Sequence, residues 1–166
     1  MTDERRLHHR RSIRLRGWDY TSAGAYFITV GTHDRICLLG DILDGKMCVN
    51  AFGTVVADTW RWLASQYPYV VLDEWCVMPN HFHGILVLTG RGGSRTAPTI
   101  KPVGRLIGAF KTVSTKRINL LRQTPGAILW QRNYWEHIVR TEDEMDRIRA
   151  YIRDNPAMWA ADSLNG

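Results

Sequence analysis

The chain has 166 residues, of which 45% are hydrophobic and 23% are charged. This length and composition predict a single globular domain over residues 1–166 with a core of its own. No apolar run approaches the ~20 residues of a membrane-spanning helix, and the first residues lack the apolar stretch of a signal peptide. We therefore expect a cytoplasmic protein with no membrane partner.

Basic residues outnumber acidic ones, with a formal net charge of +6 and a pI of about 9.5. This balance suits a polyanionic partner such as nucleic acid. Arginine and histidine crowd the first sixteen residues and predict a basic N-terminal arm over residues 1–20, which includes Arg11, Arg14 and Arg16. Such an arm either contacts DNA or is a solvated tail, and the composition leaves both possibilities open.

The first part of the chain predicts a strand, a hairpin and a helix. Aromatic and β-branched residues at 26–33 are typical of a strand. Two short apolar segments, 36–39 and 46–49, flank Asp44-Gly45 and predict a hairpin. Residues 51–67 follow the 3.6-residue period of an amphipathic helix.

The remaining elements complete a recognisable order. Residues 70–77 and 81–88 predict two strands joined by a short turn, and 103–121 predicts a second helix. A fourth strand at 135–139 precedes a helix that begins with a capping box at Thr141. This order predicts an α+β fold, a ferredoxin-like βαββαβ antiparallel sheet with an added C-terminal helix.

Three cysteines, Cys37, Cys48 and Cys76, lie in strand-like apolar segments. Their spacing fits no zinc motif. We expect all three to be buried, reduced thiols.

Two pairs of residues carry the chemistry of the chain. His81 and His83 lie two apart in a predicted strand, so both imidazoles project from the same face. Tyr151 and Asn155 lie four apart on the last helix, again on one face. Two metal-capable imidazoles and a tyrosine predict metal-assisted attack on a phosphodiester by the tyrosine hydroxyl. From spacing alone, a pair of ordinary surface or core-edge histidines is the competing interpretation.

The chain resembles the HUH single-tyrosine transposases, in particular the REP-associated tyrosine transposases. The resemblance covers most of the chain, which makes it far more specific than the His-x-His pair. The segments that carry it are Arg11-Ser12-Ile13-Arg14-Leu15, residues 24–30 (GAYFITV), residues 73–84 (DEWCVMPNHFHG), Phe110-Lys111, residues 130–140 (WQRNYWEHIVR) and residues 151–156 (YIRDNP).

The resemblance implies a metal-dependent endonuclease and strand transferase that acts on single-stranded DNA at palindromic, REP-like hairpins. Tyr151 would be the nucleophile that forms a 5′-phosphotyrosine. His81, His83 and Asn155 would hold a divalent ion, Mg²⁺ or Mn²⁺, and the C-terminal helix would bring its tyrosine across the open face of the sheet. The protein would act as a monomer or a homodimer.

Several basic residues are candidates for DNA contacts. The resemblance makes Lys111 a candidate phosphate contact, with a solvated lysine as the alternative. Arg105 belongs to a second group of basic residues in the predicted helix 103–121, and Arg132 could stack on unpaired bases together with Trp130 and Trp135. The sequence does not separate stacking from core packing for these two tryptophans.

Two other functions remain open. A relaxase or replication-initiator nickase uses the same histidines and tyrosine. A non-catalytic nucleic-acid-binding protein on a ferredoxin-like sheet would use aromatic residues on the open sheet face. A covalent protein–DNA adduct separates the catalytic functions from the non-catalytic one.

Overall fold

A computed structural model describes residues 19–90 and 99–165. Its main sheet has four strands in the order β4-β5-β1-β6, and every neighbouring pair is antiparallel. Their bounds are Gly24–Gly31 (β1), Val70–Val77 (β4), His81–Leu88 (β5) and Trp135–Val139 (β6). With one helix between β1 and β4 and another between β5 and β6, this is the predicted ferredoxin-like plan.

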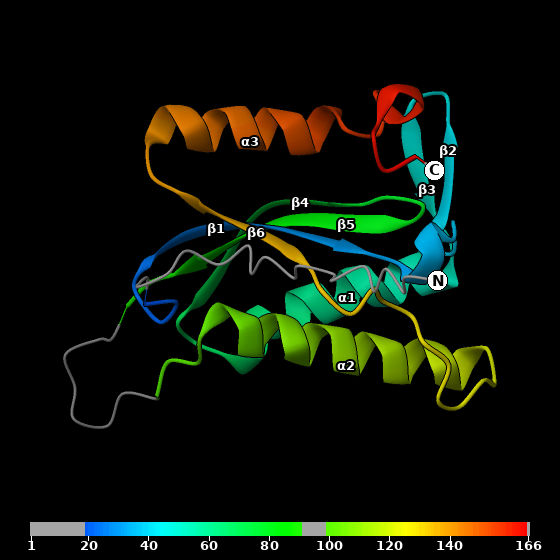
Figure 1. Cartoon of the computed structure of the whole chain (residues 1–166), viewed down its shortest axis with the longest axis horizontal. Coiled ribbons are helices and arrows are strands. Elements are labelled where there is room, and N and C mark those ends of the chain that lie inside the picture. The colour runs from blue at the N-terminus through cyan, green and yellow to red at the C-terminus, as the bar shows by residue number, and fades with distance from the viewer. Residues whose placement is uncertain (1–18, 91–98, 166) are drawn as a thin grey trace, which may run out of the picture.

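Helices cover both faces of the sheet, which gives three layers (Figure 1). Helices α1 (Ala51–Gln66) and α2 (Val103–Leu121) lie on one face, and α3 (Glu142–Asp154) lies on the other. In the described ranges, no helix combines the length and apolarity that a membrane crossing requires.

Local signals explain where the helices begin. The side chain of Asn50 accepts hydrogen bonds from the backbone N–H groups of Phe52 and Gly53 and so caps α1. At α3, Thr141 Oγ1 accepts from the Glu144 N–H, and the Glu144 carboxylate accepts from the Arg140 N–H. The capping box predicted from the sequence is therefore present, with its return bond one residue earlier than the standard pattern.

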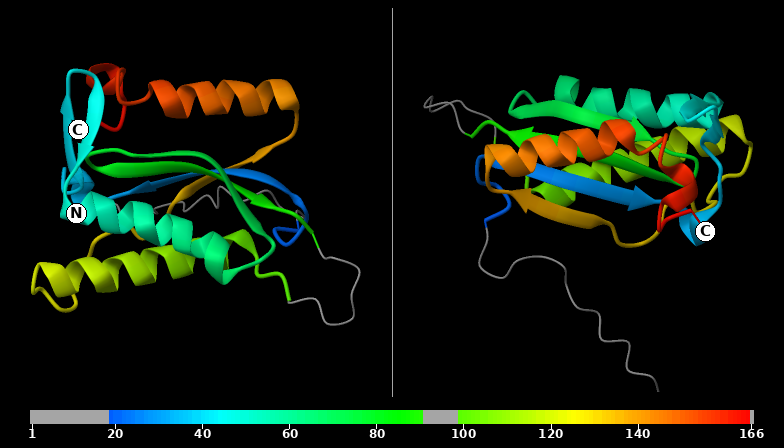
Figure 2. Two further views of the ribbon diagram at one scale, coloured as in Figure 1. Left: turned by 180° about the vertical axis from the view of Figure 1, so that it is seen from behind. Right: turned by 90° about the horizontal axis from the view of Figure 1, so that it is seen from above.

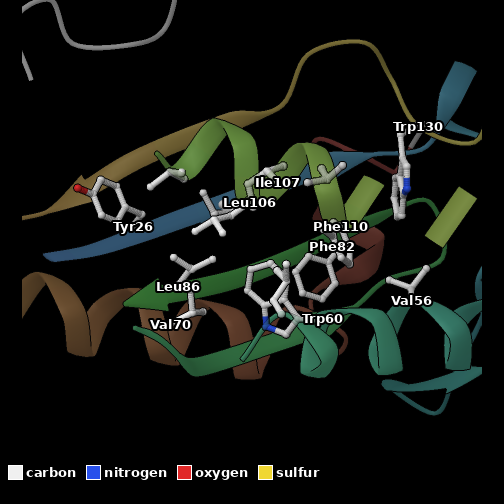
Figure 3. Packing of buried hydrophobic residues seen from close by; sticks show 14 of the residues in the cluster. Tyr26, Val56, Trp60, Val70, Phe82, Leu86, Leu106, Ile107, Phe110 and Trp130 are labelled. Atoms are coloured by element: carbon white, nitrogen blue, oxygen red, sulfur yellow. The ribbon is translucent and has the colours of Figure 1, made fainter. Parts of the chain in front are cut away.

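The main core lies between the sheet and the α1–α2 layer (Figure 3). Trp60 of α1 packs against Phe82 of β5 and Phe110 of α2, with ring centroids 4.7 and 5.4 Å away. A Cβ at Gly84 would lie 2.7 Å from the Trp60 ring, so this strand position has no room for a side chain. Trp130 is buried in the same core, where its indole N–H donates to Ser114 Oγ.

The hairpin forms around the predicted turn, but its first strand is shifted. The structure pairs β2 (Gly40–Leu43) with β3 (Lys46–Val49), whereas the sequence predicted residues 36–39. Asp44 and Gly45 both have positive φ, as a two-residue turn requires, and such a turn places Leu43 opposite Lys46. The apolar run at 36–39 instead connects η1 (His33–Arg35) to the hairpin, and Leu39 is buried in the core.

A smaller apolar cluster attaches α3 to the opposite face of the sheet. Ile152 packs on Phe27 of β1 and Ile85 of β5, and Met145 and Ile148 border this contact. After α3 the chain continues through a short 3-10 helix, η2 (Trp159–Ala161), beside the β2–β3 hairpin (Figure 1). The C-terminal segment therefore returns to the end of the sheet where β5 begins.

Candidate functional site

His81 and His83 lie together on the α3 side of the sheet. Strand alternation turns both rings to this face, with centroids 4.6 Å apart, and both residues are at least 98% buried. Along β1, Gly31 is the cross-strand partner of His81 and Thr29 is the partner of His83. The predicted placement of the histidines on a central strand and a shared face is confirmed.

Neighbouring polar groups fix the orientation of the two rings. His81 Nδ1 is 2.7 Å from Asn80 Oδ1, and His83 Nδ1 is 2.7 Å from Thr29 Oγ1. The Asn80 amide nitrogen donates to the Leu164 and Arg35 carbonyls, so its oxygen is the atom that faces His81. An amide oxygen only accepts, so His81 Nδ1 carries the proton and its Nε2 keeps a free lone pair.

Four buried polar atoms at this site have no hydrogen-bond partner in the described chain. They are His81 Nε2, His83 Nε2, Asn155 Oδ1 and Asp162 Oδ2. One ligand atom from each of His81, His83 and Asp162 lies within 4.8 Å of the other two, and His81 Nε2 is 3.6 Å from Asp162 Oδ2. Buried polar atoms without partners are costly. Two imidazole nitrogens and two oxygens are a donor set that a divalent cation would satisfy.

The protonation states fit this arrangement. Burial lowers the pKa of His81 to about 4, although the Asp162 carboxylate and the Asn155 side chain favour the charged form. Burial and the adjacent His81 lower the pKa of His83 to about 3. Both imidazoles are therefore neutral at pH 7, which is the form that binds a metal ion.

Tyr151 lies at the edge of this cluster and remains accessible. Its ring centroid is 5.3 Å from that of His83 and 6.1 Å from that of Phe27, and the residue is 46% exposed. Burial of the ring raises the pKa of Tyr151, as does the charge of Asp162, whereas the Asn155 side chain lowers it. The histidines, the asparagine and the tyrosine lie together in one chain, an arrangement that spacing alone did not predict.

Ion pairs hold α3 against the edge of the sheet. Arg149 donates from Nε and Nη2 to the two carboxylate oxygens of Asp73 on β4, at 2.8 and 2.7 Å. Arg153 lies 3.8 Å from Glu74 on the same strand. Because Tyr151 lies between these two arginines in the sequence, the pairs fix the part of α3 that carries it.

We expect Asp73→Asn to lower the melting temperature by a few degrees, because it removes the anionic partner of Arg149. The hydrogen bonds from Arg149 hold the pKa of Asp73 below its usual value. A carboxyl group with a lowered folded-state pKa stabilises the fold above its unfolded pKa, about 3.9, and loses this contribution as the pH falls through the folded value. In thermal melts across pH 2–7, the melting temperature of the wild type should therefore fall toward acid pH by more than that of Asp73→Asn.

The matched control is Asp146→Asn. Asp146 is the other partner of Arg149, but its side chain is exposed to solvent. The Asp146→Asn variant should therefore have nearly the melting temperature of the wild type. Equal effects of the two variants would show that the Asp73 pair does not hold α3.

The cysteines differ from their predicted environment. Cys37 and Cys48 are exposed, so the prediction of buried thiols is wrong for both. Cys48 lies in the two-stranded β2–β3 sheet, and Cys37 lies in the preceding connection, outside the two apolar clusters. Cys76 is half-buried opposite His83, and burial raises its pKa to about 12, so this thiol stays neutral beside the site.

The predicted DNA-contacting residues lie apart from this cluster. Arg11, Arg14 and Arg16 fall outside the described residues. Arg105 is exposed on α2, on the other side of the sheet from Tyr151. Lys111 donates to the backbone carbonyls of Gln131 and Arg132, at 2.6 and 3.0 Å, and burial lowers its pKa. The ammonium group therefore holds the segment before β6 in place, whatever else it contacts.

A basic groove follows α2 and the segment after it. Its volume is about 1380 Å³, and its cationic lining residues are Lys111, Lys116, Arg117 and Arg132. The lining includes no aspartate or glutamate. This sign of charge suits contact with phosphate groups.

Comparisons with known proteins bear on this site. No family model matches the chain. A solved structure of a REP-associated tyrosine transposase bound to a REP hairpin has a TM-score of 0.63 at 20% identity, and the match covers 88% of this chain and 74% of that one. A "putative transposase" from Deinococcus radiodurans R1 has a TM-score of 0.50 at 20% identity, covering 85% and 95% of the two chains. These two structures share the fold.

Two sequence relatives come from Haemophilus influenzae strain Rd. An uncharacterized protein is 35% identical over 171 residues, which are 95% of this chain and 94% of the relative. A protein described as a "putative REP-associated tyrosine transposase" is 26% identical over 83% of this chain and 73% of its own length. The chain is thus similar in sequence to a protein described as a REP-associated tyrosine transposase, and it shares its fold with a solved structure of one.

Sequence reasoning missed three polar residues of the site. Asp162 follows η2, an irregular segment with no hydrophobic period to place its side chain. Asn80 lies in the turn before β5, directly beside His81, so its position in the sequence was the available signal. Thr29 could be found only through its pairing with His83 across the sheet, which the sequence does not give.

Proposed function

We propose that this protein is a metal-dependent DNA endonuclease and strand transferase that cleaves single-stranded DNA at a palindromic, REP-like hairpin. The observation that carries the proposal is the position of Tyr151, whose ring is 5.3 Å from that of His83 beside four buried polar atoms without partners. A nucleophile next to groups that would bind a cation is an arrangement suited to phosphoryl transfer. The hairpin bound by the structurally similar transposase supports hairpin DNA as the substrate.

The proposed reaction exchanges one phosphodiester for another. The Tyr151 hydroxyl oxygen forms a bond to phosphorus as the bond from phosphorus to the 3′ oxygen breaks. The tyrosine proton is lost, the leaving oxygen gains a proton to become a 3′-hydroxyl, and the 5′ phosphate stays on Tyr151. Because the phosphotyrosine retains the energy of the bond, a later 3′-hydroxyl can displace the tyrosine without ATP.

The residues that would hold the divalent ion are His81, His83, Asn155 and Asp162. Bound there, Mg²⁺ or Mn²⁺ would polarise a phosphoryl oxygen and offset the Asp162 charge, which otherwise raises the pKa of Tyr151. The chain itself orients both imidazoles through Asn80 and Thr29. The proposal therefore extends the predicted ligand set by one carboxylate.

The closest alternative is a relaxase or replication-initiator nickase, which would use the same groups. A non-catalytic nucleic-acid-binding protein is the alternative from another class. Trp135 favours some binding role, because it is 43% exposed on the face that holds His81 and His83. The buried ligand atoms without partners favour catalysis, because binding bases by stacking does not require buried polar atoms that lack hydrogen bonds.

The experiment that tests the proposal is an adduct assay. The protein is mixed with Mn²⁺ or Mg²⁺ and single-stranded DNA from palindromic repeats near its own gene. A denaturation-resistant protein–DNA adduct and a free 3′-hydroxyl end should form. Cleavage that leaves no adduct would indicate attack by water and contradict the strand-transferase proposal.

DNA affinity should depend steeply on salt, because cationic side chains release counterions from the phosphates they contact. Deleting residues 1–16 removes a cluster of arginines, so the variant should bind a labelled hairpin more weakly and with a flatter salt slope. Each lost phosphate contact should reduce the slope of log K against log[salt] by about 0.9 on duplex or 0.7 on single strands.

The groove on α2 supplies the comparison for this measurement. Replacing Lys116 and Arg117 with glutamine removes two charges from the groove and none from the arm. A slope that changes only in the groove variant would place the backbone contacts on α2. In that case the N-terminal arm would have no role in binding.

A further inference from the structure

A small cavity lies beside the candidate metal site, on the same face of the sheet. Its volume is about 230 Å³, and its lining includes His81, Thr29, Gly31, Gln131, Asn133 and Trp135. It is thus bounded on one side by a proposed metal ligand. Drug-sized ligands occupy pockets of roughly 300–1,000 Å³, so this cavity suits a single small group.

Gly31 forms the floor of the cavity, where a larger side chain would take up space. Gly31 pairs with His81 across the sheet, and its carbonyl accepts from the Gln131 N–H at 2.9 Å. A Cβ at Gly31 would lie 3.1 Å from the carboxamide of Gln131. The Gln131 side chain therefore lies directly over the glycine, and any larger residue there would displace it.

The walls carry two unused carboxamides. No residue of the described chain hydrogen-bonds to the side-chain amides of Gln131 or Asn133. Each offers a donor and an acceptor. By contrast, the polar groups of Asn80 and Thr29 are engaged with the histidines. The carboxamides of Gln131 and Asn133 are thus free to bond with an occupant of the cavity.

An aromatic ring completes the cavity. Trp135 is held in place by an edge contact with Phe27, with centroids 5.4 Å apart, and by stacking on His137 at 5.8 Å. Seen from above, β6 lies beside α3 and not under it (Figure 2), and Trp135 is 43% exposed. The indole is therefore a fixed and accessible stacking surface.

We propose that this cavity binds one unpaired nucleobase of the DNA strand, adjacent to the phosphate that Tyr151 attacks. The inference rests on the proposed function and adds a site of base recognition to it. Carboxamides pair with the hydrogen-bonding edges of bases, and an indole stacks on their faces. Because His81 borders both sites, a base in the cavity places the attached backbone over the metal ligands.

The test measures binding without chemistry. Tyr151→Phe protein is titrated against a labelled single-stranded hairpin oligonucleotide from repeats near its own gene, and against versions in which one nucleotide at a time is abasic. At one position, loss of the base should weaken binding about fivefold or more, as expected for a stacked base. Asn133→Ala and Gly31→Ala are each made in the Tyr151→Phe background. In these variants, removing the base at that nucleotide position should weaken binding much less.

Gln66→Ala is the matched control, because it removes an exposed carboxamide at the far end of α1. It should retain the full abasic effect. Asn133 lies on an exposed segment, so Asn133→Ala provides the test even where Gly31→Ala disturbs the strand.

An abasic effect of unchanged size in both pocket variants, or no sensitive position in the scan, would overturn the base site. The proposed function would stand in that case, provided that the wild type still forms its adduct. Failure of the protein to bind any single-stranded DNA would contradict both.

Discussion

Tyr151→Phe should abolish the covalent protein–DNA adduct and leave DNA binding intact. The change removes the attacking oxygen, and the ring keeps its contacts with His83 and Phe27. No other described tyrosine has a ring contact with His81 or His83. Denaturing gels should show no adduct, while anisotropy titrations should give a dissociation constant close to that of the wild type.

The matched control is Tyr134→Phe. The Tyr134 hydroxyl donates to Glu136 at 2.6 Å, so its loss should lower stability and leave the adduct in place. Peptide mapping of the wild-type adduct should identify Tyr151. An adduct that persists in Tyr151→Phe, or that maps to Tyr134, would show that the nucleophile is assigned wrongly.

Replacing Asp162 with alanine should weaken Mn²⁺ binding strongly while sparing the metal-free fold. Changes to residues around a metal site typically cost 10–100-fold in affinity, and loss of a direct ligand should cost at least that much. Its Oδ2 is buried without a donor, whereas its Oδ1 accepts from the Leu164 N–H at 2.8 Å. Relief at Oδ2 and loss of the bond at Oδ1 oppose each other, so the metal-free melting temperature should change little. Calorimetric titration and thermal melts with and without Mn²⁺ measure both effects.

Asp154→Asn provides the control, because this carboxylate is exposed near the end of α3 and is absent from the metal-capable cluster. It should bind Mn²⁺ like the wild type. Replacing both His81 and His83 with alanine should abolish the metal-dependent rise in melting temperature. Undiminished cleavage by that double variant in the presence of EDTA would refute the metal centre.

The fold was predictable where hydrophobic period and turn chemistry agree. The α1 and α2 bounds follow from their apolar periods, and the α3 start follows from Thr141. The first strand of the hairpin was predicted wrongly, because it was placed on the apolar residues 36–39 and not on the residues that the turn brings opposite β3. With a two-residue turn at Asp44 and Gly45, the partners of Lys46–Val49 have to be Gly40–Leu43.

The candidate site was predictable only in part. His81, His83, Tyr151 and Asn155 follow strand and helix spacing, and the structure places their side chains side by side. The two tryptophans could not be separated by sequence, because Trp130 lies before β6, in an isolated bridge to Thr32, and is buried through its contact with Ser114 of α2. Trp135 pairs with Thr29 and is exposed, whereas Trp130 is buried.

The proposed ligands come from two segments that meet only when the C-terminal part of the chain is folded onto the sheet. His81 and His83 belong to β5, and Asn155 and Asp162 follow α3, which otherwise rests on a small apolar cluster and ion pairs. The folded chain thus presents the second pair of ligands to the first at a high effective concentration. By reciprocity, metal binding and the attachment of α3 must strengthen each other. The metal ion concentration would then set the fraction of time for which Tyr151 is held beside the phosphate.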